Sequence, residues 1–375
     1  MNTTCNRLLA VVGTRPEVVK MAPVIRCLEE EPEHFAVELA AVEQHGEVLH
    51  AALAEWGLRP ARVLPLPRSE NTTSLTASLS TMLPALYELI HGVRPDWVLV
   101  QGDTLTAFAA ALAAAYAGRP VAHIEAGLRS FDRSQPFPEE LHRELVGRLA
   151  QVHYVPSERA RDNLLAEGCP ADSIRLVGNT VVDAMRIMLG GEVTSFPLRD
   201  CAPFRILVTA HRRENFASGV KNLCMALDQL AREREQLEIT YVLHPNPEAR
   251  RPVLEILRNV PQVHLIEAIG YRDFLTVLSN SDLVLTDSGG IQEEAPYFGR
   301  PVLVIRSRTE RHEAAELGNA ELSGTDTAAI VRAVSRLLDD PELYRQRAVR
   351  VEPFGDGHAA ERIRADLKER SACLQ

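Results

Sequence analysis

Short runs of aliphatic residues alternate along the chain with longer segments whose apolar residues recur at helical spacing. In the first half, apolar runs are found at 8–13, 96–102, 121–125, 152–156 and 174–178. Helical patterns lie between them, for example at 16–31. Continuous apolar runs joined by helices are typical of a parallel sheet that is covered on both faces. The pattern therefore predicts a doubly wound α/β domain in this half of the chain.

The alternation stops between residues 189 and 204, where paired glycines and two prolines have no clear period, and we predict a linker there. It then resumes, with strands expected at 205–210, 239–244, 263–267, 282–286 and 301–305. We thus expect an α/β protein with two doubly wound, Rossmann-like domains at 1–188 and 205–350. A helix at 358–375 is expected to complete the first domain. Ligands bind beyond the carboxyl ends of strands in such sheets, so two facing domains would enclose a cleft.

Composition and charge exclude several classes of protein. The 375 residues are enough for two domains, and 46% hydrophobic with 25% charged residues excludes a disordered chain. A net charge of −10 argues against nucleic acid as a partner. The longest apolar run, 107–117, is too short to span a membrane, and the start of the chain lacks the pattern of a secretion signal. We expect a cytoplasmic protein with neither a membrane nor a nucleic-acid partner.

The sequence also lacks the motifs of several cofactor and catalytic sites. It contains no G-x-G-x-x-G after the first strand, no phosphate-binding G-x-x-x-x-G-K-[ST], and no G-x-S-x-G. The six cysteines are scattered without C-x-x-C spacing, and we expect no metal site. No bound cofactor is expected.

Three carboxylates follow expected strands or open a helix within forty residues. Asp103 and Glu125 come at the carboxyl ends of two strands, and Glu139 lies in the first turn of a helix. Converging carboxylates are a common means of moving protons to and from carbon. Each also has a structural explanation, because aspartate caps helices and glutamate favours the first helical turn.

Basic residues and glycines in both halves form candidate anion sites. Arg15 and Lys20 open the helix after the first strand, and His211 with Arg212 follows the first strand of the second half. Ser288, Gly289 and Gly290 come between a strand and a helix, where backbone N–H groups can hold phosphate oxygens. Glu294, one turn further on, could accept hydrogen bonds from ribose hydroxyls, and Arg311 could complete a phosphate pocket. Together these groups predict a sugar nucleotide as ligand.

At these residues the chain closely resembles the non-hydrolysing UDP-N-acetylglucosamine 2-epimerases, which have the GT-B fold. The motifs follow in family order over nearly the whole chain: G-T-R-P-E-x-x-K at 13–20, Q-G-D-T at 101–104, H-I-E-A-G-L-R at 123–129, P-F-P-E-E at 136–140, V-G-N-T at 177–180, H-R-R-E-N at 211–215, D-S-G-G-x-Q-E-E at 287–294 and T-E-R at 309–311.

The resemblance implies interconversion of UDP-GlcNAc and UDP-ManNAc by a homodimer. It implies anti elimination of UDP to a 2-acetamidoglucal, followed by re-addition with C2 inverted. Asp103, Glu125 and Glu139 would be the acids and bases, with His211 near the departing phosphate. Substrate would be bound by the following residues: Arg15, Lys20, Phe274, Ser288, Gly289, Gly290, Glu294 and Arg311.

The resemblance further implies a second UDP-GlcNAc that acts as an activator in bacterial members. Residues at the matching positions are Gln44, His45, Glu144, Arg212 and His244. An Arg-Gln pair of the family is replaced by Thr72-Thr73, which counts against this activator site. The chain also has His142 where the family has asparagine, and His312 directly after the T-E-R segment, where the family has proline.

Three other functions share parts of this pattern. A GT-B glycosyltransferase would share the fold and diphosphate pocket but has no need for three carboxylates around C2. A hydrolysing epimerase, which releases ManNAc and UDP, usually has an alanine and an aromatic residue where this chain has Pro16-Glu17. A non-catalytic sugar-nucleotide sensor would not need every candidate acid and base.

Overall fold

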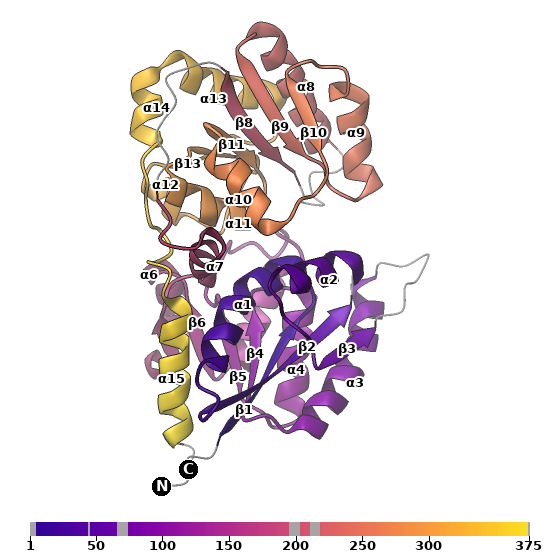
Figure 1. Ribbon diagram of the computed structural model, residues 1–375, viewed down its shortest axis with the longest axis vertical. Helices are drawn as coiled ribbons and strands as arrows, with labels where there is room; N and C mark the ends of the chain where they lie inside the picture. The colour runs from indigo at the N-terminus through magenta and orange to yellow at the C-terminus, as the bar shows by residue number, and fades with distance from the viewer. Residues whose placement is uncertain (1–4, 44–45, 66–73, 195–202, 211–217, 374–375) are drawn as a thin grey trace. The chain divides into compact units, whose positions relative to one another are not determined.

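The computed structural model describes residues 5–43, 46–65, 74–194, 203–210 and 218–373. The chain divides into two compact units (Figure 1). Unit 1 comprises residues 1–187 and 354–375, and unit 2 comprises residues 188–353. The chain therefore leaves unit 1 once and returns to it at its end.

Unit 1 is built on a seven-stranded sheet in the order β3-β2-β1-β4-β5-β6-β7, with every neighbouring pair parallel. The strands are β1 (Asn6–Val12), β2 (Phe35–Glu43), β3 (Arg62–Pro65), β4 (Trp97–Gln101), β5 (Val121–Ile124), β6 (Val152–Val155) and β7 (Ile174–Leu176). The helices are α1 (Arg15–Glu29), α2 (Gly46–Glu55), α3 (Leu75–Val93), α4 (Leu105–Tyr116), α5 (Glu139–Leu149), α6 (Glu158–Ala166), α7 (Thr180–Leu189), which continues across the boundary into unit 2, and α15 (Ala359–Cys373).

Helices cover both faces of this sheet. Leu9 and Val11 of β1 pack with α3 and α4 in one apolar cluster, and strand alternation turns Leu8 and Ala10 to the opposite face. The alanines of α4 are buried in the same cluster, where small side chains let the helix lie close to the strands. On the other side, α15 lies along α1 and is tied to its end by ion pairs from Arg364 to Glu30 and from Lys368 to Glu31.

Unit 2 has a six-stranded parallel sheet in the order β10-β9-β8-β11-β12-β13. The strands are β8 (Phe204–Thr209), β9 (Leu237–Val242), β10 (Val263–Ile266), β11 (Leu283–Thr286), β12 (Val302–Val304) and β13 (Ala320–Leu322). The helices are α8 (Gly219–Glu233), α9 (Pro247–Leu257), α10 (Tyr271–Ser279), α11 (Gly289–Glu294), α12 (Glu313–Glu316), α13 (Thr327–Asp339) and α14 (Pro341–Arg347).

The expected fold class is confirmed, because both units are parallel sheets with helices between successive strands. Three strands were not predicted: β2, β3 and β13. The order reverses beside β1 in unit 1 and beside β8 in unit 2, so each unit has a topological switch point where ligands bind in folds of this kind. None of the described helices is both long and apolar enough to cross a membrane.

Candidate active site

The turn from β1 into α1 is organised by a buried carboxylate, Glu17. Its Oε2 accepts hydrogen bonds from the Gly13 backbone N–H at 2.9 Å and from the Thr14 hydroxyl at 2.8 Å. Glu17 is fully buried, and this burial raises its pKa to about 7. Half-buried Arg15 begins α1 in this turn, and Lys20 lies buried one helical turn further on.

Asp103 follows β4, where Gly102 turns the chain with a φ of +70° that favours glycine. Its carboxylate accepts a hydrogen bond from the guanidinium of Arg143, which is itself buried. Thr104 then caps α4 by accepting a hydrogen bond from the Ala107 N–H at 3.0 Å. Asp103 therefore lies in the turn before the helix, and Thr104 takes the capping role that had been an alternative explanation for Asp103.

Glu125 stands at the end of β5 and is buried, with a φ of +63° that is uncommon for a residue other than glycine. Its Oε2 forms an ion pair with Lys20 and accepts hydrogen bonds from Gln101 Nε2 at 3.0 Å and Asn179 Nδ2 at 3.2 Å. Three donors therefore converge on one carboxylate oxygen. Gln101 and Asn179 belong to the Q-G-D-T and V-G-N-T motifs, but their partner could not be identified from sequence.

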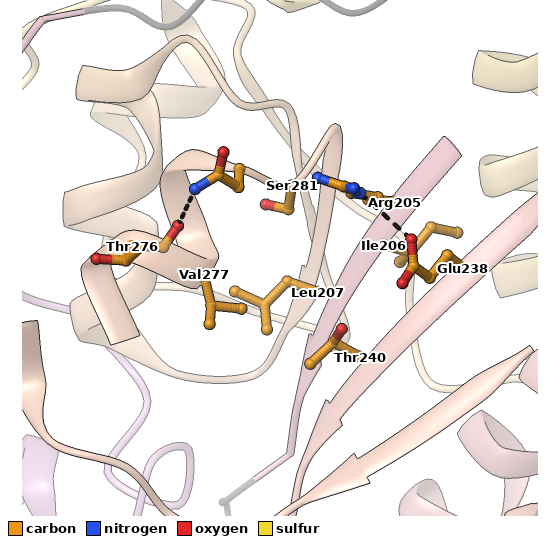
Figure 2. A pocket seen from close by; sticks show the side chains of 9 residues that line it. Arg205, Ile206, Leu207, Glu238, Thr240, Thr276, Val277 and Ser281 are labelled. Carbon is orange, nitrogen blue, oxygen red and sulfur yellow. Dashed lines mark hydrogen bonds and ion pairs between the residues drawn. The ribbon is translucent and has the colours of Figure 1, made fainter. Parts of the chain in front are cut away.

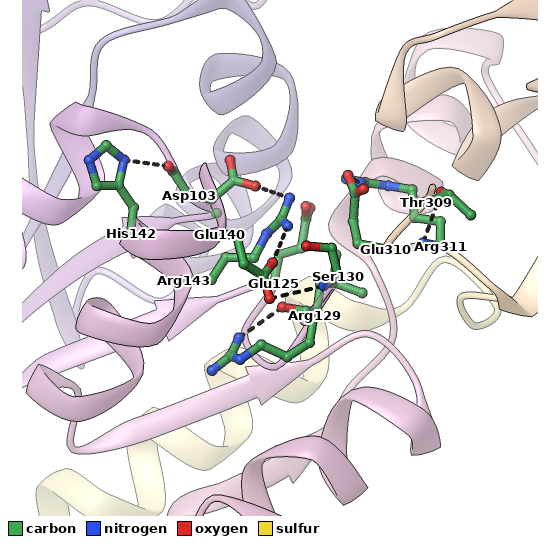
Figure 3. A network of polar contacts seen from close by, with 12 residues as sticks. Asp103, Glu125, Arg129, Ser130, Glu140, His142, Arg143, Thr309, Glu310 and Arg311 are labelled. Carbon is green, nitrogen blue, oxygen red and sulfur yellow. Dashed lines mark hydrogen bonds and ion pairs between the residues drawn. The ribbon is translucent and has the colours of Figure 1, made fainter. Parts of the chain in front are cut away.

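Two adjacent glutamates at the start of α5 differ in burial. Glu140 is fully buried, and its Oε1 accepts hydrogen bonds from the Ser130 and Phe131 N–H groups, each at 2.9 Å. Its Oε2 accepts another from Arg143 at 2.8 Å, so Arg143 links Glu140 to Asp103 (Figure 3). Glu139 is only half-buried. Glu140 thus holds the loop before α5, and Glu139 is the more exposed carboxylate at the helix start.

Unit 1 therefore brings Asp103 and Glu125 to the carboxyl ends of two adjacent parallel strands. The pairing continues past the strands, because the Gly102 N–H donates to the Ile124 carbonyl at 2.9 Å. Arg143 of α5 reaches the same edge through its contact with Asp103. Two of the three predicted carboxylates, Asp103 and Glu125, thus follow neighbouring strands, and Glu139 opens α5.

In unit 2, the turn from β11 into α11 is held by two threonines and an arginine. The Thr286 hydroxyl lies 2.6 Å from that of Thr209 and accepts a hydrogen bond from the Ser288 N–H at 2.9 Å. A side chain at Gly289 would come within 2.5 Å of the Arg311 guanidinium. The glycine therefore leaves room for Arg311 against the start of the helix.

Arg311 itself is buried among carboxylates. Its Nε donates to Glu293 Oε1 at 2.6 Å, and its Nη1 pairs with Glu310. The Thr309 hydroxyl donates to Gln292 Oε1 at 2.8 Å, which fixes the T-E-R segment to α11. The structure thus brings Ser288, Gly289, Gly290 and Arg311 together within unit 2.

Two further predicted substrate residues are near α10. Glu294 is buried and accepts a hydrogen bond from the Tyr271 hydroxyl at 2.9 Å. Phe274 lies one turn along α10 from Tyr271 and is half-buried. Tyr271 is a residue that sequence reasoning missed, since an aromatic side chain at a helix start gives no signal of its partner.

Several predicted residues fall outside the described residues, namely Gln44, His45, Thr72, Thr73, His211 and Arg212. Of the remaining activator candidates, Glu144 belongs to unit 1 and pairs with Arg133 at 2.5 Å. His244 belongs to unit 2 and accepts a hydrogen bond from the Asn246 N–H at 3.1 Å through Nδ1. His312 precedes α12 as its capping residue.

A separate cavity of about 290 Å³ lies in unit 2 (Figure 2). It is lined by residues 205–207 of β8, by Glu238 and Thr240 of β9, by Thr276 and Val277 of α10, and by Asn280 and Ser281 just after that helix. Arg205 and Glu238 form an ion pair at 3.3 Å beside it. The lining includes no predicted site residue, and it lies toward the strand starts, whereas Thr209 and Thr286 are at the strand ends.

Comparisons with known proteins place the chain in a family. The model of the family described as UDP-N-acetylglucosamine 2-epimerase matches residues 27–368. The chain belongs to this family. It is 41% identical over 373 residues to the UDP-N-acetylglucosamine 2-epimerase of Salmonella typhimurium, covering 96% of this chain and 98% of the relative.

Solved structures of epimerases agree with this assignment. The UDP-GlcNAc 2-epimerase of Neisseria meningitidis bound to UDP-GlcNAc superposes with a TM-score of 0.91 at 39% identity, covering 97% of this chain and all of that one. The Methanocaldococcus jannaschii UDP-GlcNAc 2-epimerase, in complex with UDP-GlcNAc and UDP, has a TM-score of 0.83 at 31% identity. It covers 97% of this chain and 99% of its own. The GT-B epimerase fold predicted from the motifs is thereby confirmed.

Proposed function

We propose that this epimerase interconverts UDP-GlcNAc and UDP-ManNAc without net hydrolysis. The observation that carries the proposal is the group of carboxylates in unit 1, where Asp103 and Glu125 end adjacent strands and Glu139 opens α5. Inversion at C2 requires proton donors and acceptors on both faces of the sugar ring, and more than one carboxylate can supply them.

The reaction would proceed in two balanced stages. The C1–O bond to UDP breaks as a carboxylate removes the C2 proton from the opposite face, which leaves a 2-acetamidoglucal and UDP. A proton then returns to the other face of C2 as UDP re-adds to C1. Cleavage at C1 gives oxocarbenium character that acidifies the C2 proton, so no redox cofactor is needed. Asp103, Glu125 and Glu139 are the proposed acids and bases, with His211 beside the departing phosphate.

Charge complementarity supports the proposed binding roles. Arg311, held against the start of α11, would bind the diphosphate together with the N–H groups of Ser288, Gly289 and Gly290. Arg15 and Lys20 of α1 are the other proposed phosphate-binding residues. Glu294 would meet the ribose, and Phe274 would line the uracil pocket. The relatives bound to UDP-GlcNAc and UDP support the ligand class.

The hydrolysing reaction is the alternative that the same fold could support. In this chain Glu17 of the G-T-R-P-E motif is buried and accepts hydrogen bonds from the turn before it. The aromatic residue usual at this position in hydrolysing epimerases has no carboxylate to accept them. The homodimer and the activating second UDP-GlcNAc are further proposals from the family. Size-exclusion chromatography with light scattering tests the former.

NMR of the purified protein with UDP-GlcNAc in D2O tests the reaction. We expect UDP-ManNAc with deuterium at C2 and little free sugar. Free ManNAc with UDP would instead identify a hydrolysing enzyme. No reaction, even with added fresh UDP-GlcNAc as activator, would contradict the proposal and direct the search to glycosyl transfer or another sugar nucleotide.

A further inference from the structure

The turn that presents Asp103 is held through its main chain by two buried histidines. The Gly102 carbonyl accepts a hydrogen bond from His123 Nε2 at 2.8 Å. The next carbonyl, that of Asp103 itself, accepts one from His142 Nδ1 at 2.9 Å (Figure 3). The two donors come from β5 and α5. Two different elements therefore hydrogen-bond to consecutive main-chain carbonyls of one turn.

Both rings are fixed in place by their surroundings. The His142 ring stacks on Phe108 of α4, with centroids 5.3 Å apart and planes 11° from parallel. His123 lies within the sheet and is almost completely buried. A fixed ring offers its N–H in one direction, so each carbonyl is held in one orientation.

Burial keeps both imidazoles neutral. It lowers the pKa of His123 to about 3 and also lowers the pKa of His142. The charged groups that act on His142 are Asp103 and Glu139, which favour its protonation, and Arg143, which opposes it. A neutral imidazole has one N–H, and a carbonyl accepts only from that nitrogen. The contacts therefore require His123 to carry its proton on Nε2 and His142 to carry it on Nδ1.

The third residue of the turn is held from another side. The Thr104 hydroxyl donates to Glu17 Oε1 at 2.6 Å, and the other oxygen of Glu17 binds the turn that carries Arg15. Residues 102, 103 and 104 are thus each fixed by a buried side chain, from β5, α5 and α1 respectively. We call His123, His142 and Glu17 the turn clamp.

We propose that the turn clamp positions the Asp103 carboxylate for proton transfer at C2, with the N–H of His142 holding the main-chain carbonyl of Asp103 while Arg143 contacts its carboxylate. The proposal rests on the proposed function, in which Asp103 exchanges a proton with substrate. The clamp residues are positioning residues, because they act through the main chain of the turn. Displacement of a reacting group by about 1 Å can cost about a hundredfold in rate, so loss of one contact should be measurable.

A matched pair of variants at position 142 separates the hydrogen bond from packing. His142→Asn keeps an N–H donor at the Nδ1 position but loses the stack on Phe108. His142→Leu loses both the donor and the stack. We expect kcat of His142→Asn to stay within about threefold of wild type and kcat of His142→Leu to fall about thirtyfold, with KM changed less than about twofold in both.

Each other outcome overturns the proposal. Equal loss of kcat in both variants would assign the effect to the stack, and near-normal kcat in both would show that the turn needs no donor at 142. A rise in KM at unchanged kcat would move the role of His142 to substrate binding. If wild type forms no UDP-ManNAc, the proposed function is wrong. If wild type is active and both variants are unaffected, only the proposed role of the turn clamp is wrong.

The tautomers give a test that needs no substituted residue. In wild-type protein with ¹⁵N-labelled histidine, long-range ¹H–¹⁵N spectra distinguish a protonated from a bare ring nitrogen. We expect a neutral ring with the proton on Nδ1 for His142 and on Nε2 for His123 near pH 7.5. Chemical shifts that place the proton on Nε2 of His142, or a bare Nε2 on His123, would exclude these contacts. If His142→Leu fails to fold, this measurement still tests the two contacts on which the proposal rests.

Discussion

Glu125 combines burial, an uncommon backbone conformation and three polar partners. A φ of +63° at a residue other than glycine costs on the order of 1–3 kcal/mol, and such conformations persist where surrounding contacts determine them. Here Lys20, Gln101 and Asn179 hold the side chain, all on Oε2. A proton-transfer group needs a carboxylate held in a fixed position at the strand end. A residue with a purely structural role could be held with an ordinary negative φ, without this energetic cost.

Replacing Glu125 by glutamine tests this role. We expect Glu125→Gln to lower kcat about a hundredfold or more in the folded protein, because an amide cannot accept the C2 proton. We also expect it to lower the melting temperature, because buried Lys20 loses its ionic partner. Steady-state turnover of UDP-GlcNAc and a thermal melt are the measurements. Glu158→Gln, at an exposed ion pair with Arg161, is the matched control and should leave turnover unchanged. Near-normal turnover of Glu125→Gln would remove this carboxylate from the mechanism.

His153 of β6 is a buried imidazole whose Nδ1 has no hydrogen-bond partner among the described residues. Burial lowers its pKa to about 4, below the 6.5 of an exposed histidine. Between pH 6.5 and pH 4, His153 is protonated in the unfolded chain but stays neutral in the folded protein. The unfolding free energy therefore decreases as the pH falls from 6.5 to 4. We expect His153→Leu to lose less unfolding free energy than wild type between pH 7 and pH 5, by roughly 2 kcal/mol, in urea denaturation. Parallel losses in both proteins would contradict this.

At the scale of elements, the turns after β1 and β4 are joined by Glu17, which ties Gly13 and Thr14 to Thr104. A sequence pattern predicts that both turns lie at the carboxyl edge of the sheet, because each follows an apolar run. It does not predict that Glu17 links them, since the two turns are ninety residues apart and the link depends on strand order. The same holds for Gln101 and Asn179, whose polar partner is fixed only by the fold.

The three strands that were not predicted from the sequence were missed for two different physical reasons. In β2, the apolar residues Phe35, Leu39 and Val42 have the spacing of one face of a helix. This spacing does not indicate the strand that the segment forms. The strands β3 and β13 are edge strands of four and three residues; β3 is mostly exposed, and only the first residue of β13 is fully buried. The predicted strands include the central strands β1, β4, β8 and β11, whose continuous apolar runs reflect burial on both faces, and also the edge strands β7 and β10.

Glu17 makes the joined turns sensitive to pH. Its pKa is raised from 4.5 to about 7, so the folded protein binds this proton more tightly than the unfolded chain. The unfolding free energy contributed by Glu17 is therefore greatest below pH 4.5 and is lost as pH rises to 7, by up to roughly 3 kcal/mol. We expect the unfolding free energy of wild type to fall relative to that of Glu17→Gln, which does not titrate, by roughly 2 kcal/mol from pH 5 to pH 7.5. A difference that is constant with pH, measured by urea denaturation, would contradict the raised pKa.

At the scale of the whole molecule, the path of the chain makes the two units unequal. Unit 2 is one continuous segment, 188–353, whereas unit 1 needs residues 354–375 in addition to 1–187. The returning helix α15 buries Ile363 and Leu367 in unit 1, and its Asp366 accepts hydrogen bonds from the Tyr154 hydroxyl at 2.9 Å and Arg175 at 2.7 Å. All of the proposed acids and bases that the structure describes lie in this discontinuous unit.

The unequal path predicts how fragments behave. We expect residues 188–353 to fold alone, because their apolar cluster is formed within one continuous segment. Residues 1–187 alone should melt at a lower temperature than unit 1 in the whole protein, because removing α15 exposes apolar surface and leaves Tyr154 without its buried acceptor. Circular dichroism melts of both fragments measure this.

Adding α15 in trans makes the prediction specific. The Asp183 carboxylate of α7 accepts hydrogen bonds from the Ala359 N–H at 3.2 Å and the Ala360 N–H at 2.9 Å, so the docking position of α15 is already encoded in residues 1–187. A peptide of residues 354–375 should therefore raise the melting temperature of fragment 1–187, and the same peptide with Asp366→Ala should raise it less. A scrambled peptide of equal composition is the control. If all three peptides act alike, the last helix would contribute only bulk apolar surface, and its polar contacts would not direct how the chain closes unit 1.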